Sequence, residues 1–329
     1  MALLTIKPGM EELFCQALTQ EYISNKKAPN PSDTQCLNES NHNQFIHLDQ
    51  LALGGLPEKF RDKDILELIR VLSELTVHIT YSFKMDDNTL RYCHGSGFIQ
   101  RLRKETFTLC PCRECGQKNV IQRSKEWYKL TITTASPVFK HYNSKTNTDA
   151  RAGLFYDNES SPVSKVDIQS FEAEDLNGDD NDWGVCFGVT HDQALATRLT
   201  DSIISYEKLQ GQVYRQYKNQ ECTNDKLVVV VGHPHGGPKV VTIGQRHQRI
   251  PVKSIKNGQL LCRYAYDAVT CPGSSGSPVY ILGQPISGFG YWFGHPHNHV
   301  KGIVSNRSEE SNESEANVSF STTGMECVD

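Results

Sequence analysis

The sequence predicts a mostly β protein, a double antiparallel β-barrel with an N-terminal helical extension. Three features favour this fold. Apolar and polar residues alternate over residues 77–83, which is typical of a half-buried strand. From residue 94 onward, short strand-like segments are broken by Gly and Pro, a pattern of barrels and sandwiches rather than of parallel α/β sheets. One long polar, helix-compatible stretch, residues 192–221, separates an earlier group of strands from a later one.

The elements follow in a definite order along the chain. Residues 1–55 are expected to form a flexible leader, because residues 30–43 are rich in Asn, Ser, Pro and Asp. Apolar residues at helical spacing predict an amphipathic helix over residues 62–75. The main domain is expected to span residues 56–300, with a six-stranded barrel one at about 77–190, a connector at about 191–224 and a six-stranded barrel two at about 225–300. The Ser/Glu/Asn-rich residues 301–329 are expected to be a disordered acidic tail.

The composition restricts the classes of partner. A hydrophobic fraction of 37%, a charged fraction of 22% and a net charge of -4 are ordinary for a globular protein and give no reason to expect nucleic acid or a membrane as partner. No segment approaches the roughly 20 apolar residues of a membrane span. Residues 1–14 lack the apolar core of a secretion signal, so a cytoplasmic location is expected. The 11 cysteines, an odd number, suit reduced thiols. No pattern specifies the oligomeric state.

The strongest local signal is the segment Cys-Pro-Gly-Ser-Ser-Gly-Ser-Pro at residues 271–278, followed by an apolar strand. A nucleophilic serine needs a tight turn that exposes its hydroxyl and directs backbone N–H groups at the developing oxyanion. Ser275 is the candidate nucleophile, and the N–H groups of Gly273 and Ser275 would form the oxyanion hole. By itself the segment fits an ordinary Gly/Ser turn equally well.

At this point the sequence resembles the trypsin-like serine proteases, whose nucleophile lies in a Gly-x-Ser-Gly-x-Pro turn. The resemblance is strongest to the high-temperature-requirement branch and covers about residues 95–294. It rests on several short motifs in the family's order: Gly95-Ser96-Gly97-Phe98-Ile99, Gly232-His233-Pro234-His235-Gly236, Val241-Thr242-Ile243-Gly244, Tyr266-Asp267-Ala268 and Ile286-Ser287-Gly288-Phe289-Gly290. The last is similar to the strand that binds substrate backbone. The resemblance implies a chymotrypsin-like double barrel and a protein or peptide partner.

The resemblance also implies positions for the other two members of a catalytic triad. Asp182, directly before an apolar strand, fits the family's aspartate, with Asp179, Asp180 and Asp192 as neighbouring rivals. The family's histidine follows a strand that ends in Thr-Ala. Here the strand over residues 127–135 is followed by Ser136, and a serine hydroxyl cannot act as a general base near neutral pH.

Two histidines are substitutes to weigh for this missing base. His141 comes five residues after Ser136, and His94 precedes the first barrel-one motif. His233, His235, His295, His297 and His299 are interpreted as turn or surface residues. The resulting interpretation is a catalytically impaired peptidase homologue that serves as a peptide-binding or scaffold module. The alternatives are an active serine endopeptidase with a non-standard base such as His141, and a purely structural domain.

A second group of reactive side chains is Cys110, Cys112 and Cys115. Three thiols this close can hold a structural Zn²⁺ ion, with Cys93 or His94 as the fourth ligand. The C-x-C-x-x-C spacing fits reduced cysteines in a long barrel-one loop as well. No other cofactor is expected.

Overall fold

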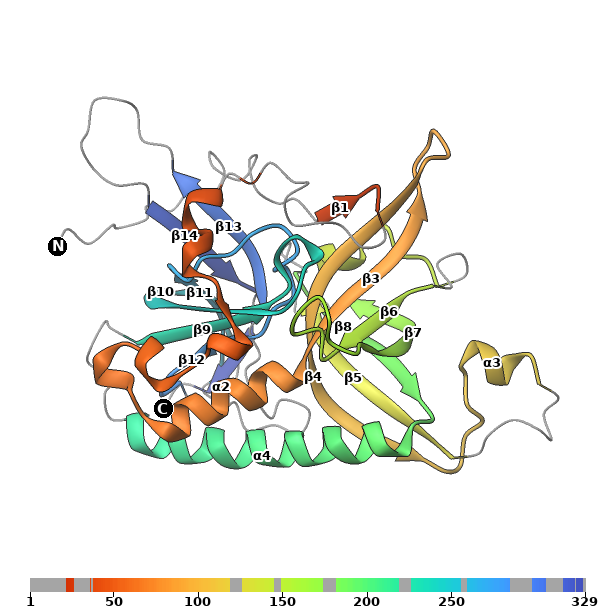
Figure 1. Ribbon diagram of the computed structural model, residues 1–329, viewed down its shortest axis with the longest axis horizontal. Helices are drawn as coiled ribbons and strands as arrows, with labels where there is room; N and C mark the ends of the chain where they lie inside the picture. Colours follow the sequence, from red (N-terminus) through yellow and green to blue (C-terminus); the bar gives the residue numbers. More distant parts are fainter. Residues whose placement is uncertain are drawn as a thin grey trace.

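The structure is a computed structural model that describes residues 22–26, 36, 38–118, 126–144, 149–173, 182–218, 226–255, 259–284, 298–305, 316–322 and 324–327. Two antiparallel β-barrels stand side by side, with two long helices beneath them (Figure 1). The predicted mostly β double barrel is confirmed. None of the helices in these residues is both long enough and apolar enough to cross a membrane.

Helix α2, Lys63–Leu75, is the predicted amphipathic helix. It begins at Asp62, whose side chain accepts a hydrogen bond from the Asp64 backbone N–H (2.7 Å) and so satisfies one free donor of the first turn. Its apolar side chains pack into the core that contains the barrel-one strands. The chain passes directly from α2 into β3, Thr76–Lys84, where the apolar period changes from helical to alternating.

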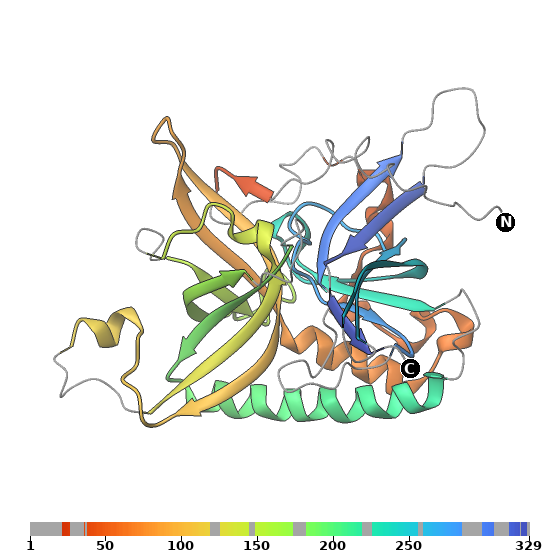
Figure 2. The same ribbon diagram turned by 180° about the vertical axis from the view of Figure 1, so that it is seen from behind.

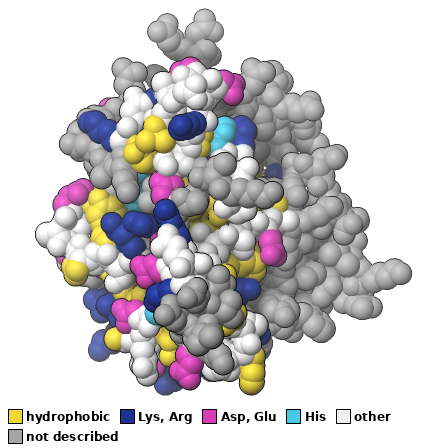
Figure 3. Space-filling view, turned by 90° about the vertical axis from the view of Figure 1, so that its right-hand side faces the viewer, with side chains coloured by type: hydrophobic (Ala, Val, Ile, Leu, Met, Phe, Trp, Pro, Cys, Tyr) yellow, Lys and Arg dark blue, Asp and Glu magenta, His cyan; other side chains and the backbone are white. Residues whose placement is uncertain are grey.

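Barrel one is a closed ring of six antiparallel strands in the order β4-β3-β6-β7-β8-β5, with β5 pairing back onto β4. Besides β3, its strands are β4 Leu90–Glu105, β5 Trp127–Ala135, β6 Arg151–Leu154, β7 Ser164–Ala173 and β8 Trp183–Thr190. Within the described residues the ring therefore spans 76–190. On the barrel-one side of the molecule, acidic and basic side chains are interspersed (Figure 3).

A short strand from the leader adds to barrel one. Strand β1, Tyr22–Ser24, pairs antiparallel with β4, with Tyr22 opposite His94 and Ser24 opposite Tyr92. At these residues β3 occupies the other edge of β4, so β1 lies on the edge that β5 uses further along. The leader continues through short 3₁₀ turns and one two-residue strand, namely η2 Glu39–Gln44, β2 Ile46–His47, η3 Leu48–Gln50, η4 Leu53–Gly55 and η5 Glu58–Phe60.

Helix α4, Gln193–Tyr217, lies in the chain between the strands of barrel one and those of barrel two. Asp192 caps its N-terminus by accepting a hydrogen bond from the Leu195 N–H (3.0 Å). The helix runs beneath both barrels and against α2, as Figure 2 shows from behind. An ion pair between Arg198 of α4 and Glu74 of α2 (3.1 Å) links the two helices.

Barrel two uses strands from the part of the chain expected to be a disordered tail. Its strands are β9 Leu227–Gly232, β10 Val240–Ile255, β11 Gln259–Tyr266, β12 Val279–Ile281, β13 His299–Ser305, β14 Ala316–Ser321 and β15 Gly324–Cys327. The sheet runs β12-β9-β10-β11-β14-β13, and a bridge between Pro278 and Asn298 joins β12 to β13. The expectation of disorder is therefore wrong for residues 301–305 of β13 and for β14 and β15; residues 306–315 lie outside the described residues.

Candidate functional site

The turn that carries Ser275 is a tight double turn whose two glycines are both required. The Ser274 N–H donates to the Cys271 carbonyl and the Ser277 N–H to the Ser274 carbonyl, each at 2.9 Å. Gly273 and Gly276 have φ values of +95° and +89°. A Cβ atom at Gly276 would collide with the Ser96 carbonyl oxygen. Glycine is therefore needed for both conformation and space.

Strand β4 holds this turn from barrel one. The Ser96 N–H donates to the Ser275 carbonyl (2.8 Å), and the Ser96 hydroxyl donates to the Gly273 carbonyl (2.9 Å). Thr134 of β5 donates its hydroxyl to the Ser96 carbonyl (2.7 Å). These bonds fix the turn at residues 271–278, the nucleophile turn of the candidate Ser275, at the junction of the two barrels.

The backbone of the turn is oriented so that it leaves two donors for an oxyanion. The His235 N–H donates to the Pro272 carbonyl (2.6 Å). In a trans peptide the N–H points opposite to the carbonyl, so the Gly273 N–H points away from His235. Among the described residues, the N–H groups of Gly273 and Ser275 have no hydrogen-bond acceptor. These are the two groups expected from the sequence to form the hole.

The Ser275 hydroxyl donates to the Val300 carbonyl (3.3 Å) at the start of β13. His299, the residue before Val300, ties β13 to the turn through both of its backbone groups. Its carbonyl accepts a hydrogen bond from the Gly276 N–H, and its N–H donates to the Ser277 carbonyl, each at 2.7 Å. The strand beside the serine is therefore β13. The expected substrate strand at residues 286–290 lies outside the described residues.

Asp182 and Ser136 meet at the ends of adjacent strands. The Ser136 N–H donates to the Asp182 carbonyl (2.8 Å), just beyond the β5–β8 pairing of Ala135 with Trp183. The Asp182 carboxylate faces the Arg263 guanidinium of barrel two at 3.5 Å, and the two side chains are 13% and 5% exposed. Arg263 was not among the site residues expected from the sequence, because its contact with Asp182 joins different barrels.

The substitute base His141 lies away from the turn. Its ring stacks on Phe83 with centroids 4.4 Å apart. Phe83 is five residues along β3 from His78, which pairs with Ser96, and five strand residues span about 16 Å. Of the rival aspartates, Asp192 caps α4, and Asp179 and Asp180 lie outside the described residues.

His233 and His235 lie in the turn after β9, as the sequence suggested, and both are buried. His299 lies in strand β13 and is buried, so the interpretation as a turn or surface residue is wrong for it. Burial lowers the pKa of His233 and of His299 to about 3 each. His299 shares a hydrogen bond of 2.8 Å with the Tyr266 hydroxyl. His295 and His297 lie outside the described residues.

The other substitute base, His94, belongs to a stack of buried rings. Its Nδ1 lies 3.2 Å from Nε2 of His78, and the two rings stack with centroids 5.3 Å apart. Burial lowers the pKa of His94 to about 4, so its ring is neutral near pH 7. Ordered ring stacking between strands is a sufficient structural role for this residue.

The sulfur atoms of Cys110, Cys112 and Cys115 converge with the ring of His191 at the outer end of β4 and β5, where α3 (Arg113–Gly116) lies (Figure 1). The four donor atoms are within 4.8 Å of one another, and His191 Nε2 lies 3.1, 3.5 and 3.5 Å from the three sulfurs. Three thiols and an imidazole suit a closed structural Zn²⁺ site.

The fourth residue of this group differs from the expectation. Cys93 donates instead to the Val138 carbonyl (3.3 Å), and His94 lies in the ring stack. His191 was missed because it follows β8, 76 residues after Cys115, and no local spacing connects them. The group could therefore pin the long β4–β5 loop to the corner between β8 and α4.

No protein-family model and no curated protein matches this chain. Among solved structures, the chain is similar to the active form of the Rv3671c protease from M. tuberculosis, with 12% identity, a TM-score of 0.37, and coverage of 80% of this chain and 82% of that chain. It is also similar to Deg5, with 12% identity, a TM-score of 0.38, and coverage of 74% and 87%. A likeness this distant carries no functional information, so function has to come from the chain's own residues.

Proposed function

We propose that this protein is a trypsin-like serine peptidase homologue with impaired catalysis, which uses the junction between its barrels to bind protein or peptide. One observation carries the proposal. In the described part of the chain, the Ser275 hydroxyl donates to the backbone carbonyl of Val300 and not to an imidazole, while the Asp182 carboxylate faces the Arg263 guanidinium.

An imidazole is the part that turns this arrangement into a catalyst. A serine hydroxyl is a weak nucleophile until a base removes its proton, and the aspartate contributes by orienting that base. Ser136 stands at the histidine position of the family resemblance. Without the base, only the acceleration from the oxyanion hole and from binding remains, about 10³–10⁴-fold over the uncatalysed reaction in water.

The β1 strand supports the peptide-binding half of the proposal. It is an extended segment that adds to the edge of β4 two residues before Ser96, the residue that holds the nucleophile turn. Tyr22 anchors it, being 6% exposed and in ring contact with His94 and His235. Strand addition of this kind is a common mode of peptide recognition, with backbone bonds for affinity and a pocket for alternate side chains.

The catalytic half is tested by labelling with a fluorophosphonate probe. We expect the wild-type protein to react no faster than Ser275→Ala, because a neutral hydroxyl attacks phosphorus slowly. Rapid labelling that Ser275→Ala abolishes would instead support an active endopeptidase. In that event the His141→Ala variant tests the alternative base.

The binding half is tested by displacing β1. We expect Tyr22→Ala to bind a fluorescent peptide of the sequence of residues 20–26 at least about tenfold more tightly than wild type, since the edge of β4 is then vacated. Ile23→Ala is the matched control, because Ile23 is 38% exposed and its removal leaves the Tyr22 anchor. If anisotropy titrations give the same peptide affinity for wild type, Tyr22→Ala and Ile23→Ala, a peptide site at this edge of β4 is refuted.

We also propose that Cys110, Cys112, Cys115 and His191 hold a structural Zn²⁺ ion. The four donor atoms suit a closed tetrahedral site, and two backbone N–H groups already donate to its sulfurs: that of Cys112 to Cys110 Sγ and that of Cys115 to Cys112 Sγ, each at 3.4 Å. Zinc analysis of reduced protein should show that Cys112→Ser loses one equivalent of zinc, whereas Cys93→Ser, a buried thiol outside the group, retains it. Equal zinc contents in the two variants would refute the site.

A further inference from the structure

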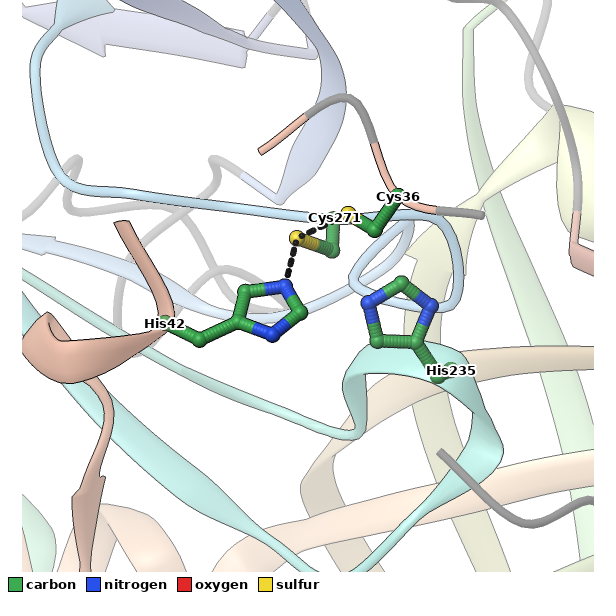
Figure 4. A group of neighbouring side chains, drawn as sticks. All are labelled: Cys36, His42, His235 and Cys271. Carbon is green, nitrogen blue, oxygen red and sulfur yellow. Dashed lines mark hydrogen bonds between the residues drawn. The ribbon is translucent and has the colours of Figure 1, made fainter. Parts of the chain in front are cut away.

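A second group of cysteine and histidine side chains lies beside the nucleophile turn. It consists of Cys36 and His42 from the leader, His235 from the turn after β9, and Cys271, the first residue of the nucleophile turn. One donor atom from each lies within 4.8 Å of the others. Figure 4 shows the four side chains pointing toward a common centre from three separate parts of the chain.

The distances between the donor atoms fit a tetrahedral metal better than a disulfide. Cys36 Sγ lies 3.2 Å from Cys271 Sγ, and Cys271 Sγ lies 3.3 Å from His42 Nε2. A disulfide requires about 2.05 Å between the sulfurs. Zn–S bonds near 2.3 Å and Zn–N bonds near 2.0 Å place tetrahedral donors about 3.3–3.8 Å apart. These two separations are therefore within about 0.6 Å of those that a zinc ion would impose.

His235 gives an independent indication that this group takes a ligand. The residue is 2% exposed, and neither ring nitrogen has a hydrogen-bond partner within the described part of the chain. A buried polar group without a partner costs about 1–3 kcal/mol, so such groups are rare and need an explanation. A metal bond to one nitrogen supplies the missing interaction.

The surrounding contacts hold the leader ligands in place. The Asn38 N–H donates to Cys36 Sγ (3.4 Å), a contact that suits a thiolate, and the Asn38 side chain donates to the Thr270 carbonyl (2.9 Å) next to Cys271. His42 stacks on Phe45 with ring centroids 4.8 Å apart. The leader is thus already docked against the base of the nucleophile turn.

We propose that Cys36, His42, His235 and Cys271 form a Cys₂His₂ site for Zn²⁺ that clamps the leader onto the nucleophile turn. On binding, the two thiols lose their protons to solvent and two Zn–S bonds form, while the histidines bind as neutral imidazoles. With four protein ligands the site is closed, so the ion is structural and activates no water. Because Cys271 and His235 flank the Pro272–Gly273 peptide, the ion would stabilise the nucleophile turn itself.

The test measures zinc in full-length, reduced protein whose other candidate site has been removed by Cys110→Ser together with His191→Ala. This background should retain one zinc per chain. Adding His42→Ala should remove it or weaken zinc binding at least about 100-fold. His47→Ala is the matched control, since His47 is an exposed histidine of the same segment and should leave the zinc in place.

A second measurement distinguishes variants that lose a zinc ligand from variants that lose zinc because they misfold. Co²⁺ added to the same background should give the thiolate-to-metal absorbance of a two-thiolate tetrahedral site. Cys36→Ser, which alters only the leader side of the group, should reduce that absorbance while the far-ultraviolet circular dichroism is retained. Zinc content that is the same in the His42→Ala and His47→Ala proteins would overturn the proposal. So would a background protein that is folded, free of zinc and joined by a Cys36–Cys271 disulfide.

Discussion

The buried ion pair between Asp182 and Arg263 makes a quantitative prediction about the site. At 3.5 Å and an effective dielectric constant of about 20, the Coulomb attraction of two unit charges is about 5 kcal/mol. Desolvation of both side chains, which are 13% and 5% exposed, offsets much of it. We expect Arg263→Met to lower the free energy of unfolding by about 3 kcal/mol, because it leaves a carboxylate with little access to water.

A double-mutant cycle isolates the pair from the other contacts of both residues. Urea unfolding of Arg263→Met, Asp182→Asn and the double variant should give a coupling energy of about 2 kcal/mol. The exposed pair of Arg151 and Asp167, 3.2 Å apart with side chains 40% and 43% exposed, is the control and should give less than about 1 kcal/mol. A buried pair whose coupling is no larger than that of the exposed pair would refute the reasoning that Arg263 holds the carboxylate.

Two further predictions concern the same region. Gly276→Ala should lower the free energy of unfolding by more than about 3 kcal/mol, because φ is +89° and the Cβ would meet the Ser96 carbonyl; a shift under about 1 kcal/mol would show that the turn relaxes. The pKa values of His94 and His299, about 4 and about 3, are depressed on folding, so the unfolded chain binds protons first as pH falls below about 6.5. Between about pH 7.5 and about pH 5.5 each histidine should therefore lower the free energy of unfolding by about 1.4 kcal/mol, and His299→Gln should remove the part due to His299. A slope of stability against pH that is unchanged in His299→Gln would contradict this.

The sequence pattern predicted those parts of the fold whose backbone conformation depends on residues close together in the chain. Helix α2 has a capping Asp62, an apolar face at helical spacing and an abrupt change of period at β3. The nucleophile turn was predicted because Gly273 and Gly276 need left-handed backbone, which few other residues adopt. Both could be read within a dozen residues of sequence.

The parts that were missed depend on partners far along the chain. Strand β14 has a polar composition typical of a tail, yet it forms because Phe320 pairs opposite Ala265 and is itself buried. His191 and Arg263 likewise acquire their roles only when separate strands meet. The group around Cys271 includes Cys36, which lies 235 positions earlier in the sequence. No spacing rule predicts a contact between residues so far apart in the chain.

If the Ser275 turn lacks only a general base, supplying that base should restore the reactivity of the serine. The measurement is the rate at which a fluorophosphonate labels Ser275 in Ser136→His, compared with wild type and with Ser136→Gln as a control of similar size. We expect an increase of about 10²–10⁴-fold in Ser136→His, and a further gain when Arg263→Met removes the guanidinium that faces the Asp182 carboxylate, which would then orient the new imidazole. Rapid labelling of the wild-type serine, with no gain from the new histidine, would contradict it.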